Sequence, residues 1–520
     1  GQCRRQGASG RDHRTSRTTV TWQCVKDDDG PILCVLAGTG QVNTRDRTMK
    51  RVLFTVARWF GRVVLAVIIV VLFLVVVFDM RLEFNGASSP RFVFGDPDEH
   101  YADLEADRLE QSSTPAIQAP TAPIQTPPRQ QPVATTPVWT DFRGPNRDGQ
   151  YTTAAIRTDW PGTGLDPLWT QPIGGGYASF VVAEGLVYTI EQRRDEEVVA
   201  AYDIHTGIEL WTHVWPANFQ ELLGGPGPRA TPTWHEGRLY ALGATGMFLC
   251  LDAKTGDVIW ERNILEDANA TNVEWAMSAS PLIVDDLVVV LPGGANSWSV
   301  AAYKYRSGDV AWHVLDDGTA YTSPMLTTLG GVRQILVVTD ERIAGLTPED
   351  GTLLWDYPWQ VAMVPNISQP LIVNPTRIFL SAGYGKGSAL IELTREGDQF
   401  TASTVWETNR MKNKFSSSVL VDDYIYGLDE SILACIDAES GELMWKGGRY
   451  GYGQLLAAED HLVVLTEDGD LVLVRATPER HEEIAGFRAI EGKTWNVPAL
   501  SDGLLLVRNT REMAAFDLSH

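Results

Sequence analysis

The first candidate for chemistry is Ala201–Trp211 (AYDIHTGIELW), which brings together Asp203, His205 and Thr206. A carboxylate, an imidazole and a hydroxyl in one short stretch could serve acid–base chemistry. The stretch recurs, however, as Cys250–Trp260 and Cys435–Trp445, and more loosely as 302–312 and 345–355. In these copies the position of His205 is taken by Lys254, Arg306, Glu349 and Glu439, whereas the glycine and the tryptophan persist. A catalytic group would not vary so freely, so the motif predicts an architectural role.

The residues that persist are those that build a tight turn between two strands. An Asp side chain can accept hydrogen bonds from backbone N–H groups two or three residues on, and glycine supplies the positive φ that ends the turn. The closing tryptophan can bury its ring against a neighbouring sheet. We therefore assign a structural docking role to Asp203, Gly207, Trp211, Asp252, Gly256, Trp260, Gly308, Trp312, Gly351, Trp355, Asp437, Gly441 and Trp445.

Each repeat unit contains about four short strands, and such units arranged radially are typical of a β-propeller. The closing tryptophans are Trp169, Trp211, Trp260, Trp312, Trp355, Trp406 and Trp445, and units without one follow over 455–475 and 497–518. The first tryptophan strand has no hairpin before it, and the last unit has no tryptophan strand after it. We therefore expect an all-β, eight-bladed propeller closed by an N-terminal strand. Seven blades would require two units to merge, most readily at the divergent unit 370–406.

The frame Ala-x-Asp-x-x-Thr-Gly-x-x-x-Trp, which Ala201–Trp211 matches at every fixed position, resembles the tryptophan-docking motif of the bacterial PQQ-like (quinoprotein-like) propellers. The resemblance covers residues 138–520. It implies the fold and leaves three kinds of function open. These are BamB-like scaffolding in the bacterial envelope, PQQ-dependent dehydrogenation with calcium, and ligand sensing outside the cytoplasm.

Ligand sites of propellers lie where the innermost strands converge on the axis. Aligning the units on their prolines places seven residues at the entrance to these strands: Tyr177, Arg229, Trp275, Tyr321, Asn366, Lys414 and Trp495. Aromatic rings, two cations and an amide would suit an anionic or aromatic ligand. Loops around a tapering hole are also polar and aromatic for packing reasons alone, so both interpretations stay open.

A PQQ-dependent dehydrogenase would need ligands and motifs that these seven residues do not supply. The resemblance implies a calcium ion with carboxylate and amide ligands, an Asp base and often a vicinal disulfide. Calcium takes six to eight oxygens, and near the axis the sequence offers only Glu274 and Asn366. There is no Cys-Cys pair, no C-x-x-C-H haem site, and no G-x-S-x-G, H-E-x-x-H or Walker motif. We therefore expect no catalytic residue, no metal site and no cofactor, with PQQ and calcium as the alternative.

The lead-in Trp139–Gly149 (WTDFRGPNRDG) is dense in turn-forming residues. We expect it to clasp the last blade, with Trp139 and Phe142 anchored on the propeller edge and Arg143 paired with a carboxylate. A role in ligand binding is the alternative.

An apolar run, Val63–Phe78, precedes the propeller, and Lys50, Arg51, Arg58 and Arg62 lie before it. With the neighbouring aromatic pair the run approaches the roughly 20 residues that span a membrane. We expect a signal anchor over 49–83 with a transmembrane helix at about 61–78; a cleaved signal peptide is the alternative. The basic residues predict a cytoplasmic N-terminus and a propeller on the extracytoplasmic, periplasmic side.

Two stretches flank this anchor. Residues 1–48 lack periodicity and are interpreted as an over-extended gene start or a disordered basic leader. Residues 84–137 are expected to form a linker, rich in Pro, Gln and Thr in its second half, that is extended and mobile. Within it, Asp96–Glu110 could form a short acidic helix, but a solvated charged stretch is the preferred interpretation.

Charge separates along the chain: residues 1–62 carry +7 and the rest carries −30. An acidic globular region argues against nucleic acid or an anionic membrane surface as a partner. The sequence thus predicts a single-pass membrane protein with a monomeric propeller. We expect this propeller to act as a non-catalytic scaffold for a protein or peptide partner in the envelope.

Overall fold

The computed structural model describes residues 21–25, 33–37, 44–113, 139–362 and 364–520, and the chain divides into two units, Gly1–Asp79 and Met80–His520. In the first unit, β1 (Thr21–Val25) pairs antiparallel with β2 (Leu33–Ala37), and α1 spans Thr44–Phe78. Residues 1–48, interpreted above as a leader, therefore contain β1, β2 and the start of α1; their other residues lie outside the described part.

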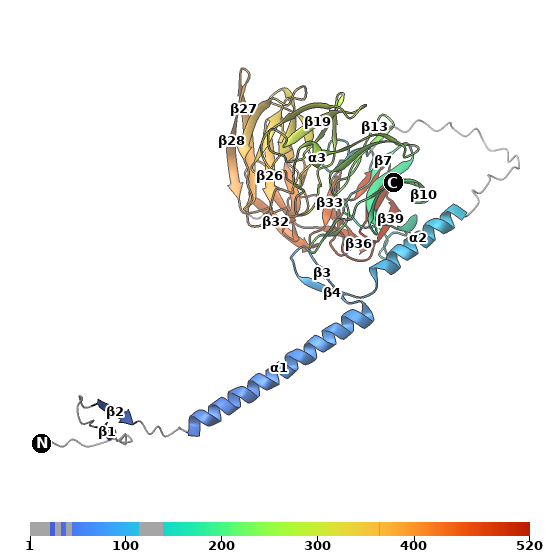
Figure 1. Ribbon diagram of the computed structural model, residues 1–520. Coiled ribbons are helices and arrows are strands. Elements are labelled where there is room, and N and C mark those ends of the chain that lie inside the picture. Colours follow the sequence, from blue (N-terminus) through green and yellow to red (C-terminus); the bar gives the residue numbers. More distant parts are fainter. Residues whose placement is uncertain (1–20, 26–32, 38–43, 114–138, 363) are drawn as a thin grey trace, which may run out of the picture. The chain divides into compact units, whose positions relative to one another are not determined.

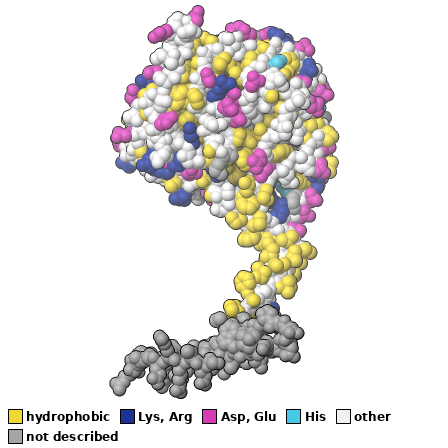
Figure 2. Space-filling model, turned by 60° about the vertical axis from the view of Figure 1, so that its left-hand side comes forward, with side chains coloured by type: hydrophobic (Ala, Val, Ile, Leu, Met, Phe, Trp, Pro, Cys, Tyr) yellow, Lys and Arg dark blue, Asp and Glu magenta, His cyan; other side chains and the backbone are white. Residues whose placement is uncertain are grey.

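Among the described residues, α1 contains the one stretch that is long and apolar enough to cross a membrane, the 27 residues Val52–Phe78. Figure 2 shows hydrophobic side chains over the visible surface of this helix. The stretch starts earlier than the predicted 61–78 because Val52–Phe60 is also mainly apolar, so the isolated Arg58 and Arg62 do not end it.

The second unit is built on a propeller of eight antiparallel blades (Figure 1). The first four blades follow the chain in order. Blade 1 comprises β7 (Val181–Ala183), β8 (Leu186–Arg193), β9 (Glu196–Asp203) and β10 (Glu209–Pro216). Blade 2 comprises β13 (Thr233–His235), β14 (Arg238–Leu242), β15 (Met247–Asp252) and β16 (Val258–Asn263). Blade 3 comprises β17 (Leu282–Val284), β18 (Leu287–Val290), β19 (Val300–Lys304) and β20 (Val310–Val314). Blade 4 comprises β21 (Met325–Leu329), β22 (Val332–Val338), β23 (Arg342–Leu346) and β24 (Leu353–Pro358).

The remaining blades include the point where the ring closes. Blade 5 comprises β25 (Leu371–Asn374), β26 (Arg377–Ala382), β27 (Gly387–Glu396) and β28 (Gln399–Thr408). Blade 6 comprises β29 (Val419–Val421), β30 (Tyr424–Asp429), β31 (Ile432–Asp437) and β32 (Leu443–Arg449). Blade 7 comprises β33 (Gln454–Ala458), β34 (His461–Leu465), β35 (Asp470–Arg475) and β36 (Glu483–Arg488). Blade 8 comprises β37 (Ala499–Ser501), β38 (Leu504–Arg508), β39 (Glu512–Asp517) and, from the N-terminal side, β6 (Trp169–Pro172).

Two predictions about the ring are confirmed. There are eight blades, and the strand that carries Trp169 pairs antiparallel with β39, the third strand of the last blade. Two short pieces lie between the blades: the ribbon β11 (Gln220–Glu221) with β12 (Gly225–Pro226), and α3 (Ile264–Asp267). The core lies between neighbouring blades; one cluster joins Tyr240 and Phe248 of blade 2 to Val288 and Tyr303 of blade 3.

The repeated tryptophans and glycines lie at the joints between blades. The indole N–H of Trp260 donates to the carbonyl of Tyr305 in the next blade (2.9 Å), and its ring covers Gly308, where a Cβ would lie 2.8 Å from the ring. In the same way Trp169 covers Gly207, Trp211 covers Gly256, Trp312 covers Gly351 and Trp406 covers Gly441. The Asp of each fully matched frame holds the turn; the Asp203 carboxylate accepts from the N–H groups of His205 and Thr206.

Trp355 departs from this pattern, although its buried ring still packs in the core cluster that joins blades 4 and 5. Its indole N–H donates to Gln334 of its own blade. The next blade offers no Asp–Gly turn at this place, because β27 and β28 run for ten residues each and project beyond the other blades (Figure 1). This joint instead uses the Tyr357 hydroxyl, which lies 2.8 Å from the hydroxyl of Thr404.

The segment Met80–Ser113 is folded against the propeller, so the expected linker is wrong over 84–113. It forms the hairpin β3 (Arg81–Phe84) and β4 (Pro90–Val93), followed by α2 (Pro97–Ser113). On α2, Leu104 is buried, His100 contacts the carbonyl of Ile173 (2.9 Å) and Arg108 donates to Glu209 (3.2 Å). These partners lie where blade 8 meets blade 1, which the composition of the segment could not show. Residues 114–137 lie outside the described part.

The lead-in 139–151 lies at the axis and not on the propeller edge, so the predicted clasp on the last blade is wrong. Trp139 bridges to Val182 of β7, and the lead-in ends in β5 (Gln150–Tyr151), which runs parallel to β33. The buried Arg143 donates to the carbonyl of Ser418, and a different arginine, Arg147, pairs with Asp141 (3.0 Å). The guanidinium of Arg147 also reaches the carbonyls of Ser280, Pro281 and Pro324. The lead-in thus ties the innermost strands of several blades together.

Candidate functional site

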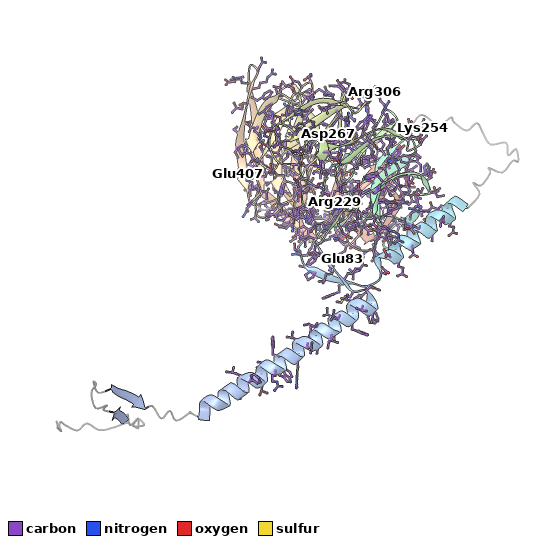
Figure 3. The ribbon with its side chains drawn as sticks, viewed as in Figure 1. Glu83, Arg229, Lys254, Asp267, Arg306 and Glu407 are labelled. Carbon is purple, nitrogen blue, oxygen red and sulfur yellow. The ribbon has the colours of Figure 1, made fainter. Side chains whose placement is uncertain are left out.

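A cavity of about 390 Å³ lies at the entrance to the innermost strands, and we call it the axial chamber. Six of the seven residues predicted for this place line it: Tyr177, Arg229, Trp275, Tyr321, Lys414 and Trp495. They come shortly before the innermost strands of blades 1, 2, 3, 4, 6 and 8. Figure 3 shows Arg229 within the propeller, whereas Lys254 and Arg306, at the variable position of the repeat, lie at its periphery.

The seventh residue, Asn366, does not line the chamber. Its side chain is buried, and its amide donates to the carbonyls of Thr339 (2.9 Å) and Trp359 (2.8 Å). Asn366 therefore ties loops of blades 4 and 5 together.

Three aromatic residues of the chamber were missed: Phe142, Tyr384 and Phe415. Phe415 follows Lys414 directly, so the alignment of the repeats could have included it. Tyr384 belongs to the loop between the middle strands β26 and β27, and Phe142 to the lead-in. Neither occupies a repeated position, so the repeat gives no signal for them.

Arg229 is held by backbone carbonyls and aromatic rings. It donates to the carbonyls of Gly225 (2.8 Å) and Gly227, and its guanidinium lies 5.4 Å from the ring of Tyr177 and 4.7 Å from that of Phe219. In the described part of the chain it forms no ion pair with a carboxylate. Burial lowers the pKa of Arg229 to about 10, although Tyr177 and Glu221 act against this effect. The side chain remains a cation at neutral pH.

Lys414 lies among three rings, 4.9 Å from that of Tyr384, 5.2 Å from that of Phe415 and 5.0 Å from that of Tyr452. Its ammonium donates to the backbone carbonyl of Gly86. Burial lowers the pKa of Lys414, and the nearby carboxylates of Glu430 and Glu467 oppose the shift. Cation–π contacts of this kind stabilise a charge that has lost water.

The carboxylates near the chamber are already engaged by N–H donors. Glu221 accepts from the indole N–H of Trp275 (3.0 Å) and the backbone N–H of Leu223 (2.9 Å). Glu467 accepts from the indole N–H of Trp495 (3.0 Å) and from the backbone N–H of Gly86. The described residues contain no group of three or more His, Cys, Asp or Glu that could hold a metal ion.

The arrangement favours binding over proton transfer. Burial raises the pKa of Tyr321 to about 12, so this hydroxyl stays neutral. The buried Tyr177 hydroxyl has no hydrogen-bond partner among the described residues. The chamber therefore presents cations, ring faces and one free hydroxyl to whatever occupies it.

Comparison with known proteins connects this propeller to one family. The family model described as "Outer membrane protein assembly factor BamB" matches residues 163–276 and 194–447. BamB of Yersinia pestis is 24% identical over 288 residues, which cover 50% of this chain and 70% of that one. A 1-butanol dehydrogenase (cytochrome c) of Thauera butanivorans is 28% identical over 128 residues, 23% of this chain and 17% of that one.

Among solved structures, a europium-containing methanol dehydrogenase superposes with a TM-score of 0.55 at 12% identity, over 71% of this chain and 89% of that chain. This likeness concerns the fold alone. Because the family model matches more than half of the residues, the chain belongs to the PQQ-like propeller family described as outer membrane protein assembly factor BamB.

Proposed function

We propose that the chain is a membrane-anchored, exported propeller that acts as a non-catalytic, protein-binding scaffold in the bacterial envelope. The family match carries this proposal. In it, Val52–Phe78 is an uncleaved anchor, and the basic residues before this stretch keep the N-terminus in the cytoplasm and the propeller in the periplasm.

The outermost strands supply a surface for such a partner. These strands carry exposed apolar side chains in several blades: Leu210, Val258, Ile259, Val310, Leu353 and Met444. The outer edge of each such strand also presents backbone groups that a strand of another chain can pair with. Apolar contact and edge pairing together suit a protein or peptide partner.

The test places a photo-reactive amino acid at Leu210, Val310 or Met444 of the full chain in native membranes. We expect a discrete adduct with one envelope protein from at least one of these positions. Asp398, at the exposed tip of the β27–β28 hairpin, is the matched control and should give no such adduct. Failure of every outermost-strand position to form a discrete adduct would overturn the proposal.

A dehydrogenase is the second candidate, because one relative is named as a 1-butanol dehydrogenase. Calcium would need six to eight oxygens, but the carboxylates of Glu221 and Glu467 already accept N–H bonds. The residues present therefore do not fit a calcium ion with PQQ. Stoichiometric uptake of PQQ with calcium, together with alcohol-dependent dye reduction, would reverse this conclusion.

A further inference from the structure

The turn of the β3–β4 hairpin occupies the mouth of the axial chamber. Asn85 and Ser88 line the chamber, and Gly86 lies between them. The N–H of Gly86 donates to the carboxylate of Glu467, and its carbonyl accepts from the ammonium of Lys414. Charged side chains of the propeller thus form hydrogen bonds with both the N–H and the carbonyl of this one residue.

The mouth of the chamber also has room only for a glycine at position 86. A Cβ built on Gly86 would overlap the ring of Tyr452. Gly86 is not among the residues with positive φ, so its backbone would accept another residue. The requirement for glycine therefore comes from the surface that receives the turn and not from the hairpin.

This receiving surface is fixed by its own neighbours. The Glu467 carboxylate is held by the indole N–H of Trp495 (3.0 Å), and the ammonium of Lys414 lies among three aromatic rings. Side chains held in their bound positions lose little freedom when a ligand arrives, which favours binding. We call Lys414, Tyr452 and Glu467 the turn receptor.

The hairpin is held much less firmly. Its strands have four residues each, and an isolated two-stranded hairpin is at best marginally stable in water. Leu82 and Phe92 are 49% and 63% exposed. The ion pair of Arg91 with Asp468 (2.7 Å) is exposed on both sides, and such pairs contribute only about 0–1 kcal/mol. A fixed receptor thus holds a loosely attached occupant.

We infer that the turn receptor binds a glycine-tipped β-turn of a partner protein, which displaces the hairpin of the chain itself. This inference rests on the proposed scaffold function and adds a second contact site, at the chamber mouth and separate from the outermost strands, together with the feature of the partner that fits it. The partner turn must present an N–H and a carbonyl on one glycine, as Gly86 does. A basic residue on the following strand would meet Asp468, as Arg91 does.

The test uses the full chain in detergent and a fluorescein-labelled peptide of residues 81–93 as the probe. Gly86→Ala in the protein removes the internal occupant, so the peptide should bind at least about tenfold more tightly than to the wild-type protein, measured by fluorescence anisotropy. Arg91→Glu weakens the internal docking without touching the mouth, and it should strengthen peptide binding in the same direction. A peptide that carries Gly86→Ala should not bind either variant.

Receptor variants are made in the Gly86→Ala protein. Lys414→Gln removes the ammonium that donates to the carbonyl of Gly86 and should weaken peptide binding by about tenfold or more. Lys386→Gln is the matched control, since Lys386 also stacks on a ring, that of Trp359 at 4.5 Å, but does not line the chamber. Equal peptide binding to wild-type and Gly86→Ala proteins, or binding of the altered peptide, would overturn the inference. Adducts at the outermost strands without any peptide binding would leave the scaffold proposal standing and reject the turn receptor alone.

Discussion

The joints between blades and the axial chamber use repeated positions of the same units in opposite ways. At five joints a tryptophan ring covers a glycine of the next blade, and we call these the docking pairs: Trp169–Gly207, Trp211–Gly256, Trp260–Gly308, Trp312–Gly351 and Trp406–Gly441. At the chamber, equivalent positions hold residues as different as Arg229, Trp275 and Lys414. Residues that persist from copy to copy therefore maintain the ring, and positions that differ are free to recognise something.

The largest expected effect comes from removing a docking tryptophan. Trp260→Ala empties a buried site between blades 2 and 3 and removes one of the two donors to the Tyr305 carbonyl, the other being the hydroxyl of Tyr240 (3.0 Å). We expect a loss of about 3–5 kcal/mol in the free energy of unfolding, the usual range for a buried aromatic residue. Denaturant unfolding measures it. Trp298→Ala is the control, because Trp298 stacks on His313 outside any docking pair and should cost clearly less. Equal losses would show that a tryptophan in a docking pair stabilises the fold no more than one outside the pairs.

The parts of the molecule that the sequence predicted are those that repeat. The eight blades, their closure by the strand of Trp169 and six of the seven chamber residues follow from positions that recur in register. Two of the docking tryptophans, Trp355 and Trp445, cover no glycine of the next blade. At Trp355 the next blade replaces the turn with a long hairpin, whereas Trp445 still donates to the carbonyl of Thr477 in the next blade (2.7 Å).

The parts that could not be predicted depend on single contacts with backbone atoms. Arg147 donates to the carbonyls of Ser280, Pro281 and Pro324, and α2 reaches the carbonyl of Ile173 through His100. Every residue carries a carbonyl, so the sequence does not indicate which one an arginine or a histidine will find. The hairpin at the chamber mouth was hidden for the same reason, because the receptor binds the backbone of Gly86.

A second prediction concerns Glu197, a charge buried between blades 1 and 2 that belongs to no docking pair. Its carboxylate accepts from the N–H of Ala244, and burial raises its pKa to about 7. The folded state then binds more protons than the unfolded state between about pH 4.5 and 7, so this group costs stability as pH rises through that window, by about 3 kcal/mol in total.

Glu197→Gln keeps an acceptor for Ala244 but cannot ionise. The variant should match the wild type near pH 4.5 and be more stable at pH 8, measured by denaturant unfolding at both values. Glu261 is exposed, so the control Glu261→Gln should leave the free energy of unfolding unchanged at both pH values. A variant that is less stable at pH 8 would show that the Glu197 charge supports the joint.

A smaller effect isolates the contact within a docking pair. Gly256 and Gly237 both have positive φ (77° and 74°), but a Cβ would meet the Trp211 ring only at Gly256, while Gly237 has open space. Both alanine variants carry the backbone strain, and only Gly256→Ala also disturbs the joint. We expect Gly256→Ala to cost about 1–3 kcal/mol more than Gly237→Ala in the free energy of unfolding. Equal costs would show that Gly256 is needed only for its backbone conformation and not for its contact with Trp211.

The smallest expected effect belongs to the chamber. The lowered pKa of Arg229 means that the folded state already disfavours its charge. Arg229→Met removes that cost and keeps an apolar side chain of similar length against Tyr177 and Phe219, while it gives up the bonds to two carbonyls. Replacing a buried cation by an apolar residue is often close to neutral, so we expect a change of about 1 kcal/mol or less in the free energy of unfolding. Arg147→Met is the control and should cost several times more, because the carbonyls of Ser280 and Pro324, in two different blades, lose this donor and the carboxylate of Asp141 loses its ion-pair partner. A large loss from Arg229→Met would place the chamber cation among the residues that hold the ring together and remove the main reason to regard the chamber as a binding site.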